Sequence, residues 1–144
     1  MITVKQILRS KGHAAWTISP DASVLEALQL MEQKDIGALV VVEGKKLVGM
    51  FSERDYARKF IHGMGSTKDI QVRELMSAPV DTVRPGMSIG ACMALMTERR
   101  FRHLPVVEGE NLVGMISIGD VVKAIISEQQ KVIDELGNFI SGKR

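Results

Sequence analysis

The order of apolar and polar positions along the chain predicts the same set of elements twice. Apolar residues from Val24 to Met31 recur at helical spacing and predict a helix over residues 24–34. Two apolar, β-branched runs follow, at residues 39–42 and 47–51. The Glu-Gly-Lys-Lys stretch between these runs is typical of a hairpin turn. The second half of the chain repeats this order of helix and hairpin.

The repetition is a gap-free internal repeat, which is the first feature to establish because it decides the fold. Residues 17–61 align with residues 82–126 at a constant offset of 65, and 17 of the 45 aligned positions hold the same residue. A weaker echo precedes each copy, since residues 4–8 resemble residues 72–76. The longest identities are Val-Val-Glu-Gly at 41–44 and 106–109, and Leu-Val-Gly-Met at 47–50 and 112–115.

Each copy predicts the element order β-α-β-β-α. A short strand ends at Pro20 in the first copy and at Pro85 in the second, because a residue without an N–H group favours the end of a strand. Ser23 and Ser88 stand where the first helix of each copy begins and are predicted to cap it. The hairpin runs are apolar without strict alternation, so we expect helices to cover them.

We therefore expect an α/β fold in which two β-α-β-β-α repeats pack about a pseudo-twofold axis. A single repeat of about 60 residues buries too little surface to be robust alone. Residues 1–64 are the predicted first repeat, 65–126 the second, and 127–144 a C-terminal helical tail, and together they make one module. The polar, glycine-rich stretch at residues 62–69 is the predicted linker.

The predicted tail continues the last helix and carries an apolar stripe with a 4-3-4-3-4 spacing. This spacing is typical of a short coiled-coil seam. The alternative is that the stripe packs back onto its own module. A glycine inside the tail weakens the helix and would allow a bend. The stripe consists of Val122, Ile126, Gln129, Ile133, Leu136 and Ile140, and the glycine is Gly137.

Composition and charge exclude several classes of protein. The 144 residues are 45% hydrophobic and 25% charged, with a net charge of +2, which is too balanced for a protein that coats nucleic acid or membranes. Aromatic residues make up only 4%, which argues against a base-stacking surface. The single cysteine, Cys92, excludes an internal disulfide and fits a reducing compartment. No apolar run approaches the roughly 18 residues of a membrane span, and no signal pattern opens the chain, so we expect a soluble, cytoplasmic protein.

Candidate chemistry is concentrated in a paired heptapeptide at a strand-to-helix junction. The two copies read Gly-Met-Phe-Ser-Glu-Arg-Asp at residues 49–55 and Gly-Met-Ile-Ser-Ile-Gly-Asp at residues 114–120. The glycine permits a close backbone approach, and the serine with the helix N-terminus can receive an oxyanion. The aspartate can accept hydrogen bonds from the two hydroxyls of a ribose. The alternative is that serine and aspartate only cap the helix.

A Gly-apolar-apolar-Ser-x-x-Asp motif after an apolar hairpin, in a tandem repeat with Thr-x-x-Pro at the start of each copy, resembles the CBS-domain pair, or Bateman module. The resemblance covers residues 3–126. It implies a compact disc with two clefts that bind adenosine-containing ligands such as AMP, ADP, ATP, NAD(H) or S-adenosylmethionine. Carried over, it implies aspartates for ribose, serines for ribose or phosphate, and methionines as adenine walls. The implied binding residues are Gly49, Met50, Ser52 and Asp55 in the first copy and Gly114, Met115, Ser117 and Asp120 in the second.

Basic residues differ between the two copies. Arg102 and His103 lead into a strand where the family commonly places phosphate-contacting groups, and the matching residues of the first copy are Gly37 and Ala38. Arginine suits phosphate because its planar fork donates two parallel hydrogen bonds. Arg54, next to the first aspartate, is a further candidate. The resemblance thus predicts two unequal clefts.

The chain lacks a pattern that would supply a catalytic or metal site. His13, His62 and Cys92 share no metal-ligand spacing, and no nucleophile stands with a base at motif spacing. We expect a ligand-sensing regulatory module that binds an adenine nucleotide, AMP first, and passes its occupancy to an unknown regulated protein. The alternative is a small enzyme or nucleotide-turnover protein. The resemblance also implies a homodimer, and no nucleic-acid or membrane partner is expected.

Overall fold

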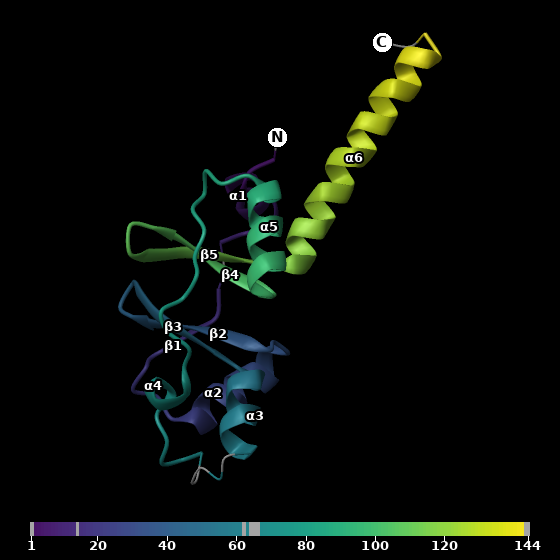
Figure 1. The fold of residues 1–144 in the computed structure, drawn as a ribbon. Coiled ribbons are helices and arrows are strands. Elements are labelled where there is room, and N and C mark those ends of the chain that lie inside the picture. The colour runs from purple at the N-terminus through teal and green to yellow at the C-terminus, as the bar shows by residue number, and fades with distance from the viewer. Residues whose placement is uncertain (1, 14, 62, 64–66, 143–144) are drawn as a thin grey trace.

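The protein is described by a computed structural model that covers residues 2–13, 15–61, 63 and 67–142 (Figure 1). His62 and residues 64–66 of the predicted linker at 62–69 therefore lie outside the described residues. The predicted β-α-β-β-α order is confirmed in the first copy. In the second copy the two helices and the hairpin are confirmed, but the predicted first strand is wrong, because Val83 forms an isolated bridge to Val106 rather than a strand. In chain order the elements are α1 (Val4–Lys11), β1 (Thr17–Ile18), α2 (Val24–Lys34), β2 (Ala38–Glu43), β3 (Lys46–Ser52), α3 (Glu53–Ile61), α4 (Val72–Leu75), α5 (Ile89–Arg99), β4 (His103–Glu108), β5 (Asn111–Ser117) and α6 (Ile118–Ile140).

The two predicted hairpins lie in one five-stranded sheet with the order β1-β2-β3-β5-β4. They meet only at their turn ends, where Lys46 of β3 pairs with Asn111 of β5. Leu47 N donates to Glu110 O over 3.1 Å, and Leu112 N donates to Lys45 O over 3.0 Å. These two bonds exchange under the repeat offset of 65, as a pseudo-twofold axis between the copies requires.

The helices that precede the two repeats are exchanged between them. Val4 N, at the start of α1, donates to Met87 O of the second repeat over 2.9 Å. Val72 N, at the start of α4, donates to Ala22 O of the first repeat over 2.8 Å. The weak echo before each copy therefore marks a pair of equivalent helices, and each one closes the hydrophobic core of the other repeat.

Two hydrophobic cores result from this exchange. One contains Val4, Ile7 and Leu8 of α1 together with the buried residues of α5, β4 and β5. The other contains Val72 and Leu75 of α4 together with the buried residues of α2, β2 and β3. Cys92 is fully buried in the first of these cores, as its helical position predicts, and burial raises the pKa of its thiol.

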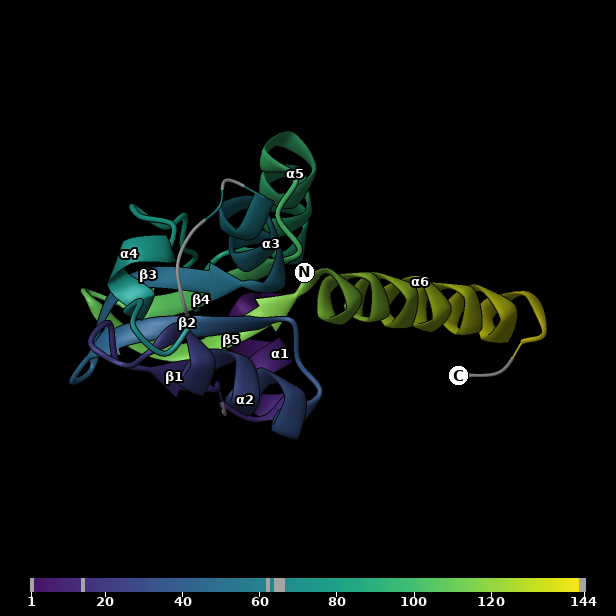
Figure 2. The same cartoon turned by 90° about the horizontal axis from the view of Figure 1, so that it is seen from below.

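Helix α6 packs on the module over its first turns and then leaves it (Figures 1 and 2). Val121 is buried, whereas the residues from 129 to 140 are all exposed. The alternative in which the whole stripe packs back onto its own module is therefore wrong. The helix runs through Gly137 without a break. Among the described residues, no helix has the length and apolar character needed to cross a membrane.

Candidate functional site

Both Ser-x-x-Asp motifs cap a helix. Ser117 Oγ accepts from Asp120 N over 3.1 Å, and Asp120 Oδ2 accepts from Ser117 N over 2.8 Å, so the two residues form a reciprocal capping box at the start of α6. Ser52 and Asp55 make the same pair of bonds at α3, over 3.2 and 2.9 Å. The capping interpretation is thus correct as geometry. These bonds fix each carboxylate at a strand-to-helix junction.

The second junction carries a cation that the sequence motif does not contain. Lys11, the last residue of α1, donates from Nζ to Asp120 Oδ2 over 2.7 Å and to Met115 O over 3.0 Å. The side chains of Lys11 and Asp120 are 35% and 23% exposed. The ion pair is therefore partly buried and joins the exchanged helix to the motif aspartate. A separation of 109 residues hides this contact from any local pattern.

Burial and charge set the protonation states at this junction. Burial by itself would raise the pKa of Asp120, but the hydrogen bonds and charge from Lys11 and Ser117 outweigh it, so the pKa of this carboxyl lies below its ordinary value. Burial lowers the pKa of His103, and the charges of Lys11 and Arg102 lower it further against the opposing effect of Asp120. At neutral pH the junction therefore holds a carboxylate and a neutral imidazole.

The first junction has a neutral partner in place of the cation. Ser77, just after α4, donates from Oγ to Asp55 Oδ1 over 2.9 Å. The backbones of Ser77 and Met50 also exchange two hydrogen bonds, of 3.0 and 2.8 Å. Because α1 and α4 are equivalent at an offset of 68, the position that corresponds to Lys11 is Pro79. The two junctions are alike in their aspartate and serine and differ in charge.

Strand register places the predicted basic residues beside the motif of the second repeat. His103 pairs with Ser117 across the hairpin, and Ile118 N donates to Arg102 O over 2.8 Å. In the first repeat Ala38 pairs with Ser52 at the same register. The structure thus brings His103 and the Arg102 backbone to the Ser117–Asp120 motif, as the alignment predicts. The Arg102 side chain is exposed to solvent.

An acidic depression of about 380 Å³ lies beside the strand entrance of the first repeat. Its carboxylates come from Glu32, Asp35 and Glu53. At an offset of 65 the corresponding residues of the second repeat are Thr97, Arg100 and Ile118. The first entrance therefore carries negative charge where the second carries positive or neutral groups.

The remaining predicted binding residues are the two glycines, the two methionines and Arg54. Gly49 and Gly114 are buried in the sheet, and a Cβ atom there would come within 2.6 Å of Met76 Sδ and 2.8 Å of Leu8 Cδ2, respectively. The glycines thus admit the side chains of the exchanged helices. Met50 and Met115 are half-buried on the central strands β3 and β5. Arg54 is exposed in the first turn of α3.

Fold and site together define a class of protein, a tandem α/β module with one Ser-x-x-Asp junction in each repeat. The family model described as "CBS domain" matches residues 4–62 and again residues 72–127. The chain belongs to the CBS-domain family, as its resemblance predicts.

Individual relatives agree with this assignment. The mitochondrial CBS domain-containing protein CBSX3 of Arabidopsis thaliana is 37% identical over 150 residues, which cover 97% of this chain and 72% of that protein. The structure of a protein with CBS domains from Burkholderia ambifaria is 48% identical, with a TM-score of 0.81, over 89% of this chain and 96% of that one. The structure of CBSX2 in complex with AMP is 27% identical, with a TM-score of 0.73, over 90% and 99% of the two chains.

Proposed function

We propose that this CBS-domain module is a regulatory sensor of an adenine nucleotide, with AMP as the expected ligand and ADP, ATP or NAD(H) as alternatives. The observation that carries the proposal is the cluster at the second junction, where Asp120 lies beside Lys11 and His103. This cluster combines an acceptor for ribose hydroxyls with donors for a phosphate. The AMP complex of CBSX2 supports the same ligand class.

Asp120 is the proposed ribose contact. Its Oδ2 atom already accepts from Ser117 N and from Lys11 Nζ. A carboxylate offers about four acceptor positions, so the two hydroxyls of a ribose find acceptors without loss of the helix cap. The low pKa of Asp120 keeps it ionised at neutral pH, and hydrogen bonds to an ionised acceptor are the stronger ones.

Lys11 and Arg102 are the proposed phosphate contacts, and Ser117 lies between them and the ribose. Arg102 is accessible to a ligand because it is exposed at the strand entrance. Lys11 is a compact charge on a flexible stem and can pivot from the carboxylate to a phosphate. His103 is neutral at pH 7 and serves as a hydrogen-bond donor or acceptor there. Met115, flanked by Gly114, offers a polarizable surface for adenine.

The first cleft is the proposed weaker site. Met50, Ser52 and Asp55 repeat the adenosine-binding groups, and Gly49 repeats the glycine. The neighbouring carboxylates of Glu32, Asp35 and Glu53 disfavour a phosphate there. Arg54 is the candidate in this repeat that could offset them. We therefore propose one tight AMP site at the second repeat and one weak site at the first.

We propose that nucleotide binding changes how the two repeats pack and that an unidentified regulated protein responds to this change. We also propose that the module works as a cytoplasmic homodimer. Signalling of this kind needs a ligand with different affinity for two arrangements. The narrow Lys46–Asn111 contact between the hairpins is a place where two arrangements can differ at low cost. The groups of each cleft are assigned to binding rather than to turnover, so the proposal is a sensor and not an enzyme.

Calorimetric titration with AMP, adenosine and GMP tests the proposal. AMP should bind in a tight and a weak class of site, and adenosine should show a much smaller difference between them. At a hundredfold excess over Kd, AMP should stabilise the folded protein by about 2.7 kcal/mol. Asp120→Asn should weaken the tight class, and Asp55→Asn, its matched control, only the weak one. Absence of binding by every adenosine compound at millimolar concentration would refute the proposal.

A further inference from the structure

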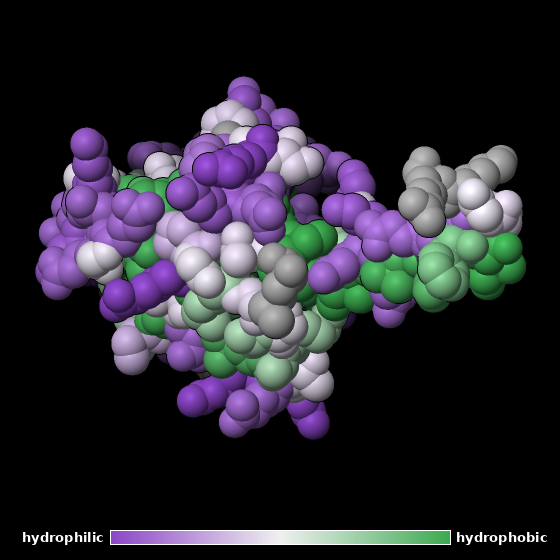
Figure 3. All heavy atoms as spheres, turned by 90° about the horizontal axis from the view of Figure 1, so that it is seen from above, coloured by the Kyte–Doolittle hydropathy of each residue, from purple (hydrophilic) through white to green (hydrophobic). Residues whose placement is uncertain are grey.

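The outer half of α6 presents large apolar side chains to solvent. Ile133 is 59% exposed, Leu136 56% and Ile140 83%. Toward the module the same face continues through Ile126, which is 60% exposed. With 23 residues the helix is about 35 Å long, and the stripe follows most of that length. Figure 3 shows it as a green band along the projecting helix.

The two flanks of this stripe differ in polarity. One flank is itself apolar and contains Ile118, Ile125, Val132 and Phe139, which follow one another at intervals of seven residues. The other flank is polar and contains Lys123 and Gln130, again seven residues apart, followed by Gly137. The surface is therefore a helix seam with one apolar edge and one polar edge.

We propose that this seam pairs with α6 of a second copy of the chain, and that the two helices run antiparallel. Eight exposed, large apolar residues of the seam and its apolar edge, weighted by their exposed fractions, present on the order of 900 Å² per chain, and a stable interface buries about 800 Å² per partner. These residues are Ile118, Val122, Ile126, Val132, Ile133, Leu136, Phe139 and Ile140. A second α6 matches the heptad spacing of the seam because it carries the same spacing.

The polarity of the two edges decides whether the paired helices run parallel or antiparallel. In a parallel pair of helices, opposite edges face each other, so Ile125 and Val132 would lie against the polar edge with Gln130. In an antiparallel pair, like edges face each other, and the apolar edge meets the apolar edge. Antiparallel pairing therefore buries Ile125 and Val132, whereas parallel pairing leaves them against polar groups.

A single register satisfies the apolar and the charged residues together. When Ile125 lies level with Val132 of the second copy, Ile118 lies level with Phe139, because each pair of residue numbers has the same sum. The same register sets Lys123 level with Asp134 of the second copy. Eleven residues apart, Lys123 and Asp134 lie within about 20° of each other on the helix, so they share an edge and meet as opposite charges.

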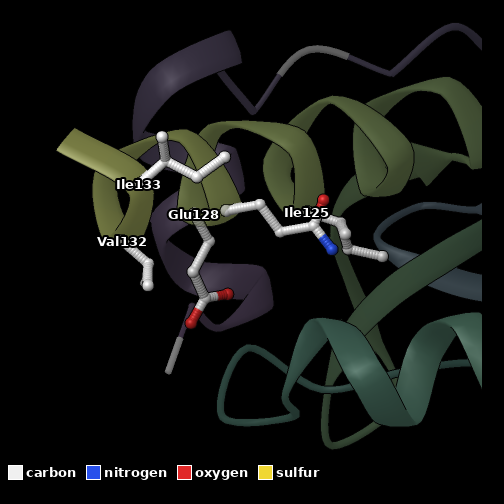
Figure 4. Close-up of a pocket in the computed structure, with 5 residues that line it drawn as sticks. Ile125, Glu128, Val132 and Ile133 are labelled. Carbon is white, nitrogen blue, oxygen red and sulfur yellow. The ribbon is translucent and has the colours of Figure 1, made fainter. Parts of the chain in front are cut away.

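The surface of α6 offers space for this partner. A shallow groove of about 440 Å³ is lined by Glu128 together with residues of the seam and its apolar edge, and Figure 4 shows these side chains on one helix. In the proposed register Val132 of the second copy enters at this groove. The lining residues are Ile125, Glu128, Gln129, Val132 and Ile133.

The inference deepens the homodimer of the proposed function by assigning its interface, and it does not depend on the nucleotide site. The seam residues from 129 to 140 are all exposed, and the ribose and phosphate contacts proposed above lie at or before residue 120. Oligomeric state is measured without any nucleotide, so failure of the interface and failure of the sensor proposal are separate results.

Sedimentation velocity at micromolar concentration measures the oligomeric state. We expect a dimer for the unmodified chain and a monomer for Ile133→Glu, in which two carboxylates would be buried in the seam and weaken association by about 100-fold or more. Lys131→Glu, on the polar side of the same turn of α6, is the matched control and should remain a dimer. A monomeric unmodified chain, or a dimeric Ile133→Glu variant with unchanged circular dichroism, overturns the proposal.

Charge reversal and cross-linking test the direction. Lys123→Asp and Asp134→Lys should each weaken the dimer by about 5- to 30-fold, and the double variant should restore it. With a short bismaleimide, Gln129→Cys should cross-link near the twofold axis, whereas Leu136→Cys should not, because its two copies lie roughly 20 Å apart along antiparallel helices. Efficient cross-linking of Leu136→Cys would show a parallel pair and overturn the antiparallel arrangement.

Discussion

Replacement of Lys11 by methionine should separate phosphate binding from ribose binding at the second junction. Methionine keeps the length and the apolar stem of the side chain and removes the charge. In the free protein the ammonium of Lys11 lies 2.7 Å from Asp120 Oδ2. A bound phosphate would compete with the carboxylate of Asp120 for this cation, whereas adenosine brings no such competitor.

The expected magnitude follows from the exposure of the ion pair. Because the side chains remain 35% and 23% exposed, solvent screens the pair, and its contribution to stability should be about 1 kcal/mol. A hydrogen bond from Lys11 to a phosphate contributes about 1.5–3 kcal/mol. Since the cation is shared with Asp120, the net loss of AMP affinity in Lys11→Met should be about 0.5–2 kcal/mol, or 2- to 30-fold.

Isothermal titration with AMP and with adenosine measures this separation. Adenosine affinity should stay within about 2-fold or improve, because Asp120 loses a competing partner. Lys5→Met is the matched control, since it removes the same charge from the same helix and leaves the junction intact. Equal losses for AMP and adenosine would refute the reasoning, because they would show that Lys11 only positions the cleft.

Three further predictions concern the two clefts. Asp120→Asn, which keeps the helix cap, should weaken AMP by about 10- to 150-fold. Calorimetry should show a similar loss for deoxy-AMP on the unmodified chain, and simple addition of the two losses would exclude a ribose contact. Arg102→Ala should reduce the preference for AMP over adenosine at the tight site, and Gly37→Arg should raise it at the weak site, both measured by titration. The lowered pKa of Asp120 stabilises the fold above the unfolded value of about 3.9, and this contribution is lost as the pH falls through the lower folded pKa. Urea unfolding should therefore show Lys11→Met less stable than the unmodified chain at pH 7, with the difference vanishing in acid.

Local features of the fold were predictable because each depends on interactions between residues that are close in sequence. The caps at Ser23 and Ser88 follow from side chains that bond the backbone three residues ahead, over 3.0 and 3.1 Å. The hairpins follow from apolar runs around a turn whose glycine has a positive φ, as Gly44 does at 63°. The gap-free repeat then extended each local prediction to the second copy.

Contacts between distant segments were not predictable in this way. The exchange of α1 and α4 depends on which of two similar cores each helix joins, and both cores are apolar. Gly49 and Gly114 show the consequence, since the close approach they permit is made by Met76 and Leu8. Lys11 carries no motif of its own. It becomes a candidate site residue only because the exchange brings the end of α1 to Asp120.

The position of Asp120 links the two proposals and yields a last prediction. This residue caps the first turn of α6, and the same helix carries the proposed dimer seam. Lys11 ties it to α1, which also packs against α6. A nucleotide that draws Lys11 away from Asp120 therefore changes the support of α6 at its base.

By linkage, a factor by which AMP changes the dimer constant must equal the factor by which dimerisation changes AMP affinity. Sedimentation equilibrium with and without AMP, and titration of AMP into the unmodified and Ile133→Glu chains, measure the two factors independently. Typical couplings of 1–3 kcal/mol correspond to changes of about 5- to 150-fold. Identical dimer constants with and without AMP would show that AMP binding is not coupled to pairing of α6 and is transmitted through another part of the module.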